Sequence, residues 1–219
     1  RRPFLLREHF DRLQRSLGEL RIRTDVDRLE QRTLQTLAES GVVDGVVYIH
    51  VSRGEAPTRT HKFPVPPPAP NELIYVRELA ADPYPDVRER GATAITLPDL
   101  RWRRCDIKSV NLLGNVLAAQ AAEEAGCDEA LLVAEDGWLT EATHTILFGV
   151  DGGCILTAPL KSNVLPGITR QLVVRLAERI GEDVYNCAVF IDHDGKICGK
   201  YHKMHFAEGY DPAWWYNRL

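Results

Sequence analysis

The chain has 219 residues, and its 44% hydrophobic and 26% charged side chains are an ordinary composition for a globular protein with a real core. Its formal net charge is −4, which argues against a general nucleic-acid or membrane surface. No apolar run approaches the roughly 18 residues of a membrane span, and no secretory signal is visible.

The five cysteines are odd in number and widely spaced, without a CxxC pair; they are Cys105, Cys127, Cys154, Cys187 and Cys198. This pattern indicates reduced thiols in a cytoplasmic protein, with neither a disulfide framework nor a metal site. The chain begins at Arg1 without a methionine and ends abruptly at Leu219, so both ends are expected to be cuts through a larger protein.

Helix and strand signals alternate through the first half of the chain. Apolar residues recur on one face over residues 7–17 and again over 25–39, which predicts two amphipathic helices. Asp25 is a possible N-cap of the second helix, and Gly41 is its stop signal. Strands are predicted at Val46–Val51, Leu73–Leu79 and Thr93–Leu97, with a rigid proline loop at 64–70.

Helices and strands are also predicted in the second half of the chain. Helices are predicted at Asn111–Ala125 and Gly167–Ile180, and strands at Glu129–Ala134, Thr145–Val150 and Cys154–Thr157. The composition changes after Gly181. Residues 184–191 and 196–203 flank an Asp-Gly turn and predict a β-hairpin, which an aromatic, irregular tail follows.

Lys108 ends the segment Arg101-Trp-Arg-Arg-Cys-Asp-Ile-Lys108. We expect it to close an apolar β-run and to precede a helix directly, so its side chain should be partly buried. Burial lowers the pKa of a lysine and makes its amine a usable nucleophile. The segment therefore favours a Schiff base with an aldehyde cofactor.

Glu141 lies 33 residues after Lys108, at the edge of a predicted strand. A pyridine cofactor needs a carboxylate beside its ring nitrogen, because a protonated ring is the better electron sink. Taken alone, Glu141 is interpreted as a solvated loop acid. Its pairing with Lys108 favours the cofactor role instead.

Three further segments offer groups for anionic ligands. The segment 165–169 opens a helix, where backbone N–H groups and a hydroxyl bind phosphate well; an ordinary turn with Thr169 as N-cap is the alternative. Arg59 and His61 lie two apart on an expected extended segment and suit a substrate carboxylate, although an exposed loop pair is the alternative. Arg12, on the first helix, is by default a surface charge.

Five motifs occur in one order along the chain: Tyr48-Ile-His-Val-Ser-Arg-Gly54, Arg59-Thr-His-Lys-Phe-Pro64, Arg104-Cys-Asp-Ile-Lys-Ser-Val-Asn-Leu-Leu113, Leu139-Thr-Glu141 and Leu165-Pro-Gly-Ile-Thr-Arg170. With these motifs, residues 1–181 resemble the class IV pyridoxal-phosphate aminotransferases, and most of all their D-amino acid (D-alanine) branch. The Arg-Cys-Asp-Ile-Lys-Ser block is the most specific of them.

The resemblance implies that pyridoxal 5′-phosphate is the cofactor. Lys108 would form the internal aldimine and shuttle the proton, Glu141 would hold the pyridine nitrogen, and Leu165 would lie against the ring. The phosphate would be bound by Arg12, by the backbone N–H groups of Ile168 and Thr169 at the helix start, and by the Thr169 hydroxyl.

The resemblance also implies the substrates. Arg59 and His61 would hold the substrate α-carboxylate, a feature that branched-chain aminotransferases and aminodeoxychorismate lyases lack. The reaction would be ping-pong transamination between a D-amino acid such as D-alanine and a 2-oxo acid, with no nucleic-acid or membrane partner. Since the family is typically dimeric, a homodimer is expected.

The sequence departs from the family pattern at three places. The first strands of the small domain are missing, together with a tyrosine near the cofactor. The serine-rich stretch after the glutamate is here Ala142-Thr-His-Thr-Ile146, in which two threonines could still supply hydroxyls. The final segment of the family is replaced by residues 183–219.

Residues 184–205 resemble the middle of a nitrilase-type carbon–nitrogen hydrolase, whose triad lysine would match Lys203. Cys187 and Cys198 are interpreted as packing residues of the hairpin. Two alternatives to the aminotransferase therefore stay open: a carbon–nitrogen hydrolase relative, and an inactive chimeric fragment.

The predicted fold class is α+β, in three parts. Residues 1–95 form a small α/β domain that lacks its first strands. Residues 96–182 form a larger, truncated barrel-like domain that binds the cofactor. Residues 183–219 form a hairpin and tail, and the hairpin is expected to supply strands in place of lost ones.

Overall fold

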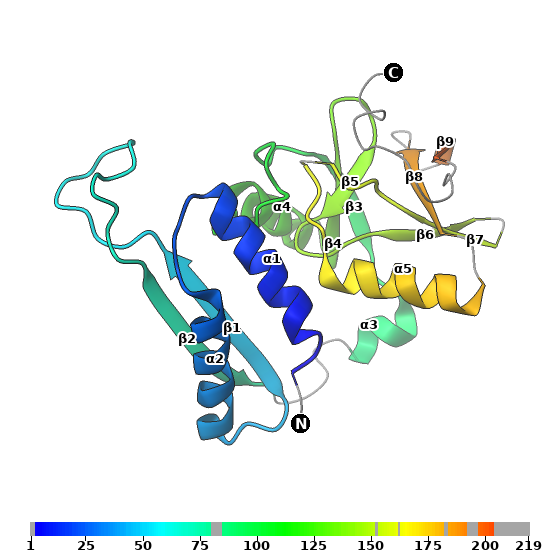
Figure 1. Ribbon diagram of the computed structural model, residues 1–219. Coiled ribbons are helices and arrows are strands. Elements are labelled where there is room, and N and C mark those ends of the chain that lie inside the picture. The colour runs from blue at the N-terminus through cyan, green and yellow to red at the C-terminus, as the bar shows by residue number, and fades with distance from the viewer. Residues whose placement is uncertain are drawn as a thin grey trace. The chain divides into compact units, whose positions relative to one another are not determined.

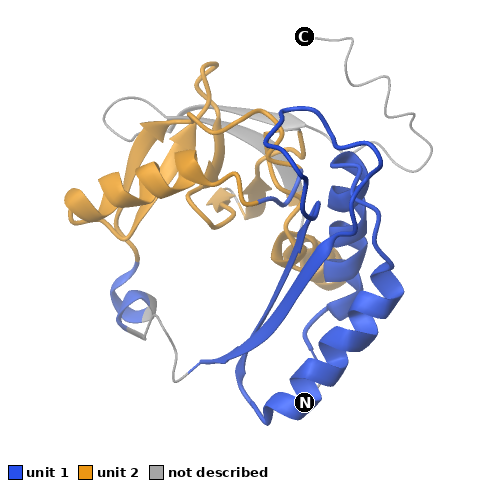
Figure 2. Ribbon diagram, turned by 90° about the vertical axis from the view of Figure 1, so that its left-hand side faces the viewer, with its two compact units in different colours: residues 1–91, 107–109 blue, residues 92–106, 110–219 orange. Residues whose placement is uncertain are grey.

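The computed structural model describes residues 3–79, 85–151, 153–161, 163–181, 184–191 and 197–203, the last two ranges almost entirely by backbone alone. Helices and strands are mixed along the chain, which confirms the α+β class (Figure 1). Two compact units are present. Unit 1 comprises residues 1–91 and 107–109, and unit 2 comprises residues 92–106 and 110–219 (Figure 2). The predicted boundaries at residues 95 and 182 stay a prediction.

Unit 1 contains three helices and a two-stranded sheet among the described residues: α1 (Leu6–Glu19), α2 (Val26–Ser40), β1 (Gly45–Ser52), β2 (Asn71–Glu78) and α3 (Pro85–Arg90). The first four confirm the predicted helices and strands, whereas α3 was not predicted. Phe10 and Leu17 of α1 and Leu29 of α2 are buried, as the 3.6-residue periodicity requires. None of the described helices is both long and apolar enough to cross a membrane.

Both predicted ends of α2 are confirmed. The Asp25 side chain accepts a hydrogen bond from the backbone N–H of Arg28 at 3.0 Å, and so caps the first turn. Gly41 ends the helix with φ at 68°, a left-handed conformation that favours glycine.

Asp25→Ala is expected to lower the free energy of unfolding by about 1 kcal/mol, because the N–H of Arg28 loses its side-chain acceptor. Urea unfolding followed by circular dichroism measures the change. The matched control is Asp25→Asn, which keeps an acceptor at the same position and should unfold close to the wild type. Equal losses in both variants would contradict the capping role.

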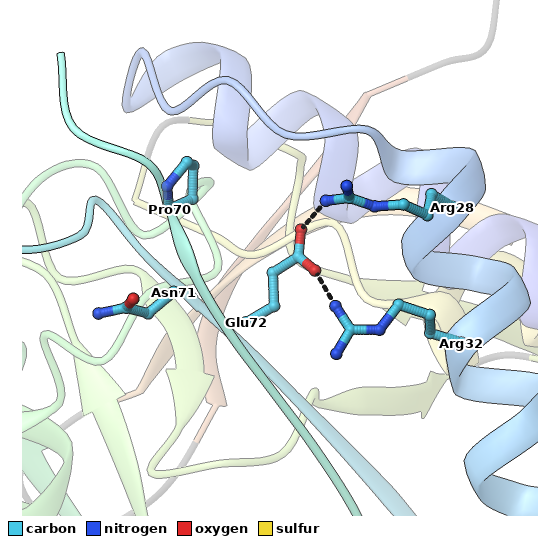
Figure 3. A pocket seen from close by; sticks show the side chains of 5 residues that line it. All are labelled: Arg28, Arg32, Pro70, Asn71 and Glu72. Carbon is cyan, nitrogen blue, oxygen red and sulfur yellow. Dashed lines mark hydrogen bonds and ion pairs between the residues drawn. The ribbon is translucent and has the colours of Figure 1, made fainter.

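The sheet of unit 1 is an antiparallel pair, in which Tyr48 lies opposite Tyr75. Helix α2 packs against it, mainly against β2 (Figure 1). The Glu72 carboxylate of β2 accepts hydrogen bonds from Arg28 and Arg32 of α2 (Figure 3). It also accepts one from the hydroxyl of Thr24. These contacts tie the helix to the strand and hold the pKa of Glu72 below its usual value, with the Thr24 hydrogen bond as the largest stabilising cause.

Glu72→Gln is expected to destabilise unit 1 at neutral pH, and the difference from the wild type should shrink as the pH falls. The folded pKa of Glu72 is lowered, so its contribution is present above the unfolded pKa of about 4.3 and is lost as the pH falls through the folded pKa. Urea unfolding at several pH values between neutral and acid tests this. A difference that does not depend on pH would contradict it.

Unit 2 contains two helices and seven strands among the described residues: β3 (Ala94–Pro98), α4 (Leu113–Glu124), β4 (Glu129–Val133), β5 (Leu139–Ala142), β6 (Phe148–Asp151), β7 (Cys154–Thr157), α5 (Ile168–Ile180), β8 (Val184–Ile191) and β9 (Ile197–Lys203). No range was predicted for strand β5, although Glu141 was expected at a strand edge, and the strand expected from residue 145 begins only at Phe148. Helix α4 packs on strand β4 through a cluster of four buried residues: Ala118, Ala122, Ala130 and Leu132.

The strands of unit 2 form two sheets. In the first, β3 pairs with β4 in parallel and β4 pairs with β5 in antiparallel, with α4 as the crossover helix between β3 and β4. In the second, the order is β6-β7-β8-β9. Both sheets are open among the described residues, so the expected barrel-like form is not closed.

The predicted hairpin is confirmed as the antiparallel pair β8–β9, while its turn at 192–195 lies outside the described residues. Strand β8 also pairs in parallel with β7, with Ile155 opposite Val184. The hairpin is therefore part of the second sheet of unit 2, as expected of a segment that supplies strands.

Candidate functional site

Lys108 belongs to the short segment 107–109, which is part of unit 1 although the residues on both sides of it belong to unit 2. Ile107 is buried, and the backbone N–H of Lys108 donates a hydrogen bond to the hydroxyl of Ser16 at 3.1 Å. Ser16 is itself buried on α1, so this contact anchors the segment to that helix.

Two expectations about Lys108 were wrong. Residues 101–112 form turns and bends without a strand, and the Lys108 side chain is exposed. The chain leaves β3 in a turn because the Asp99 carboxylate accepts a hydrogen bond from the backbone N–H of Arg101 at 3.1 Å. An exposed amine on an anchored backbone can be approached by a ligand.

A cluster of basic side chains lies near Lys108 within unit 1. Burial lowers the pKa of His9 most, and the positive charges of Arg12 and, more weakly, Lys108 lower it further. The negative charge of Glu8 raises it. Arg12 is half-buried, so its interpretation as a plain surface charge was wrong. Burial, with the charge of Arg15, lowers the pKa of Arg12. This concentration of positive charge suits an anionic ligand.

Glu141 lies on β5 in unit 2 and is 8% exposed, which excludes a solvated loop acid. Its Oε2 accepts a hydrogen bond from Arg101 Nη1 at 2.6 Å. Burial raises the pKa of Glu141, while Arg101 and the backbone N–H of Leu165 oppose the rise. The carboxylate is thus buried, oriented and bonded to the loop before α5.

Arg101 was not predicted from the sequence. Its guanidinium donates to both oxygens of Asp99, at 2.9 and 2.8 Å, besides its bond to Glu141. The side chain is 6% exposed. The only sequence signal was an Asp-Leu-Arg run directly after an apolar strand, which gives no indication of burial.

The predicted phosphate-binding segment lies at the start of α5. Gly167 is the N-cap, and among the described residues no side chain caps this end, so the alternative of Thr169 as N-cap was wrong. Thr169 is exposed in the first turn, Ile168 is buried, and Leu165 is half-buried in the loop before the helix. Uncapped N–H groups at a helix start are suited to an anion.

Arg59 and His61 lie in the long loop between β1 and β2, and both are exposed. The loop bends at residues 57–58 and 61–62, so the expected extended segment was wrong. Its base is tight: at Gly54, with φ at 97°, the carbonyl of Ala69 leaves no room for a Cβ atom. The Arg53 guanidinium lies 3.7 Å above the ring of Phe63, which holds the loop near its middle.

The two threonines after Glu141 have their own acceptor. The hydroxyls of Thr143 and Thr145 donate to the Glu129 carboxylate on β4, the second at 3.1 Å, and the Thr143 N–H donates to it at 3.2 Å. They tie the end of β5 to β4, so their expected availability to a ligand is reduced.

The predicted residues fall into three local groups. In unit 1, Lys108 lies near His9 and Arg12, while Arg59 and His61 share the exposed loop. In unit 2, Glu141, Leu165, Ile168 and Thr169 lie together. Within the described ranges, no three His, Cys, Asp or Glu side chains are grouped as metal ligands would be. The side chains of Lys203, Cys187 and Cys198 lie outside the described residues, so the hydrolase alternative stays a prediction.

The sequence matches the amino-transferase class IV family over residues 1–198, and the chain belongs to this family. The match extends beyond the expected residue 181 and includes β8. D-alanine aminotransferase of Staphylococcus epidermidis is 39% identical over 177 residues, which are 80% of this chain and 61% of that protein. D-alanine aminotransferase of Bacillus licheniformis is 37% identical over 191 residues, 86% of this chain and 66% of that protein.

The fold is shared with solved structures. One is the T.th. branched-chain amino acid aminotransferase with pyridoxamine 5′-phosphate, which has a TM-score of 0.73 and 28% identity. That comparison covers 83% of this chain and 61% of the other. This chain thus spans under two thirds of the length of each of these relatives.

Proposed function

We propose that this chain binds pyridoxal 5′-phosphate and transfers an amino group between a D-amino acid and a 2-oxo acid. The observation that carries the proposal is the buried Glu141 carboxylate, which is hydrogen-bonded to Arg101 and to the loop that opens α5. Family membership and the two D-alanine aminotransferase relatives support the same reaction class.

The residues present fit this cofactor. Glu141 offers a fixed acceptor for a protonated pyridine nitrogen, and the uncapped start of α5 at Ile168 and Thr169 offers N–H donors to a phosphate. Arg12, half-buried in unit 1, is proposed as a further cation for the phosphate. When bound, pyridoxal phosphate supplies an aldehyde and an electron-withdrawing ring.

Lys108 supplies the amine and the proton transfer in this proposal. Its Nζ would hold the aldehyde group of the bound cofactor while no substrate is present and, once a substrate amine had replaced it there, would accept the proton from the substrate Cα. The hydrogen bond from its backbone to Ser16 fixes the base of this side chain on α1. Arg59 and His61 bind the substrate α-carboxylate, with the Arg59 guanidinium as a two-pronged donor.

The test is transamination of D-alanine with 2-oxoglutarate by the 219-residue chain in the presence of pyridoxal phosphate. We expect steady formation of pyruvate and D-glutamate, and no reaction with L-alanine. Absence of turnover, together with absence of a protein-bound cofactor absorbance band, would overturn the proposal. Turnover of L-amino acids alone would overturn the D-specific part of it.

A further inference from the structure

Arg101 contacts three separate segments of unit 2 at once. Its Nε and Nη2 bind Asp99, its Nη1 binds Glu141 at 2.6 Å, and its Nη2 also donates to the backbone carbonyl of Asn163 at 3.1 Å. Asp99 follows β3, Glu141 is on β5, and Asn163 lies in the loop before α5. A planar guanidinium with several donors can hold such a set rigidly, which a lysine ammonium cannot.

The contacts leave the Glu141 carboxylate little freedom. Arg101 holds its Oε2, and the backbone N–H of Leu165 binds the same carboxylate from the loop. Arg101 also binds the carbonyl of Asn163, two residues before Leu165. One side chain therefore orients the carboxylate and fixes the loop that leads into the start of α5.

We propose that Arg101 is a positioning residue, which holds the Glu141 carboxylate aimed at the pyridine nitrogen and sets the loop before the phosphate-binding turn. This inference rests on the proposed function, since it names how the same site is held in shape. Arg101 itself is assigned no contact with cofactor or substrate.

The charges around Glu141 give this inference a distinctive pH signature. Arg101 lowers the pKa of Glu141 and Asp99 raises it, while burial raises the pKa of the nearby Cys105 to about 11, so that this thiol is neutral near pH 7. Removal of the arginine should therefore make Glu141 protonate at a higher pH. Removal of the Asp99 charge should make it protonate at a lower pH.

The experiment measures the affinity of the cofactor-free chain for pyridoxal phosphate, by absorbance titration across the pH range from acid to alkaline. The variants are Arg101→Met, Arg101→Lys and Asp99→Asn. The matched control is Arg103→Met, because Arg103 is 89% exposed and its ion pair among the described residues is a 4.0 Å approach to the exposed Glu135. Near-UV circular dichroism checks that each variant keeps its tertiary structure.

We expect Arg101→Met to weaken binding at least about tenfold at neutral pH, the effect of losing a hydrogen bond to a charged group. The acid side of its binding profile should move to higher pH, and the profile of Arg101→Lys should lie between those of the wild type and Arg101→Met. Asp99→Asn should move the acid side to lower pH, and Arg103→Met should match the wild type. If Arg101→Met does not fold, the opposite shifts of Arg101→Lys and Asp99→Asn carry the test.

Wild-type affinity and an unchanged pH profile in the Arg101 variants would overturn the positioning role and leave the proposed function standing. A loss of affinity that is equal at every pH would also overturn it, because it would indicate structural damage alone. No binding by the wild type at any pH would overturn the proposed function, and this inference with it.

Discussion

Replacing Lys108 with alanine is expected to abolish covalent attachment of pyridoxal phosphate and to lower transamination by at least about 10³-fold, since both the nucleophile and the proton carrier are lost. The backbone N–H of residue 108 still donates to Ser16 in the variant, so the segment 107–109 should keep its place on α1. The effect should therefore fall on chemistry and leave stability nearly unchanged.

Borohydride reduction followed by mass spectrometry of the intact chain and of its proteolytic peptides checks the covalent bond directly. The wild type should gain the mass of one reduced cofactor on the peptide that contains Lys108, and Lys108→Ala should gain none. Lys161 is an exposed lysine of unit 2, and Lys161→Ala is the matched control that should label and react like the wild type. Labelling of Lys108→Ala at another lysine would contradict the assignment.

Replacing Glu141 with glutamine is expected to lower kcat by about 10²–10³-fold, the effect of removing one pre-organised, buried electrostatic partner. The amide has nearly the same shape, and its oxygen can still accept the hydrogen bond from Arg101. What is lost is the negative charge that stabilises a protonated ring nitrogen.

The readout that separates this role from a structural one is the comparison of kcat with cofactor affinity and stability. In Glu141→Gln, kcat should fall far more than the free energy of unfolding changes. Glu135→Gln is the matched control, because Glu135 is a 96% exposed acid a few residues before β5. A wild-type kcat in Glu141→Gln, with cofactor bound, would contradict the role of the carboxylate.

Local signals were enough for most of the helices and strands. The N-cap at Asp25 and the stop at Gly41 both follow from side-chain and backbone chemistry within one turn, and the structure has them as predicted. Strand β5 (Leu139–Ala142) was missed, although β7 of the same length was predicted, because Leu139-Thr-Glu-Ala142 lacks the apolar run of β7 and the strand depends on pairing with β4. A pattern of period two cannot be read reliably from so few residues.

The surroundings of Lys108 show where sequence reasoning failed. An apolar residue before a lysine, in Ile107-Lys108, suggested a strand and a buried amine. The tertiary structure instead buries Ile107 against unit 1 and leaves the lysine side chain exposed. The hydrogen bond from the Lys108 N–H to Ser16, a residue 92 positions away, ties this segment to α1.

By itself, the sequence determined the family, the order of the elements and the identity of the candidate residues, because motifs and periodicity are properties of neighbouring residues. Only the tertiary structure decided how Glu141 is held. Its burial, its bond to Arg101 and its contact with the loop before α5 join segments 24 to 40 residues apart. Such contacts depend on packing and on the desolvation of charges, which no local pattern encodes.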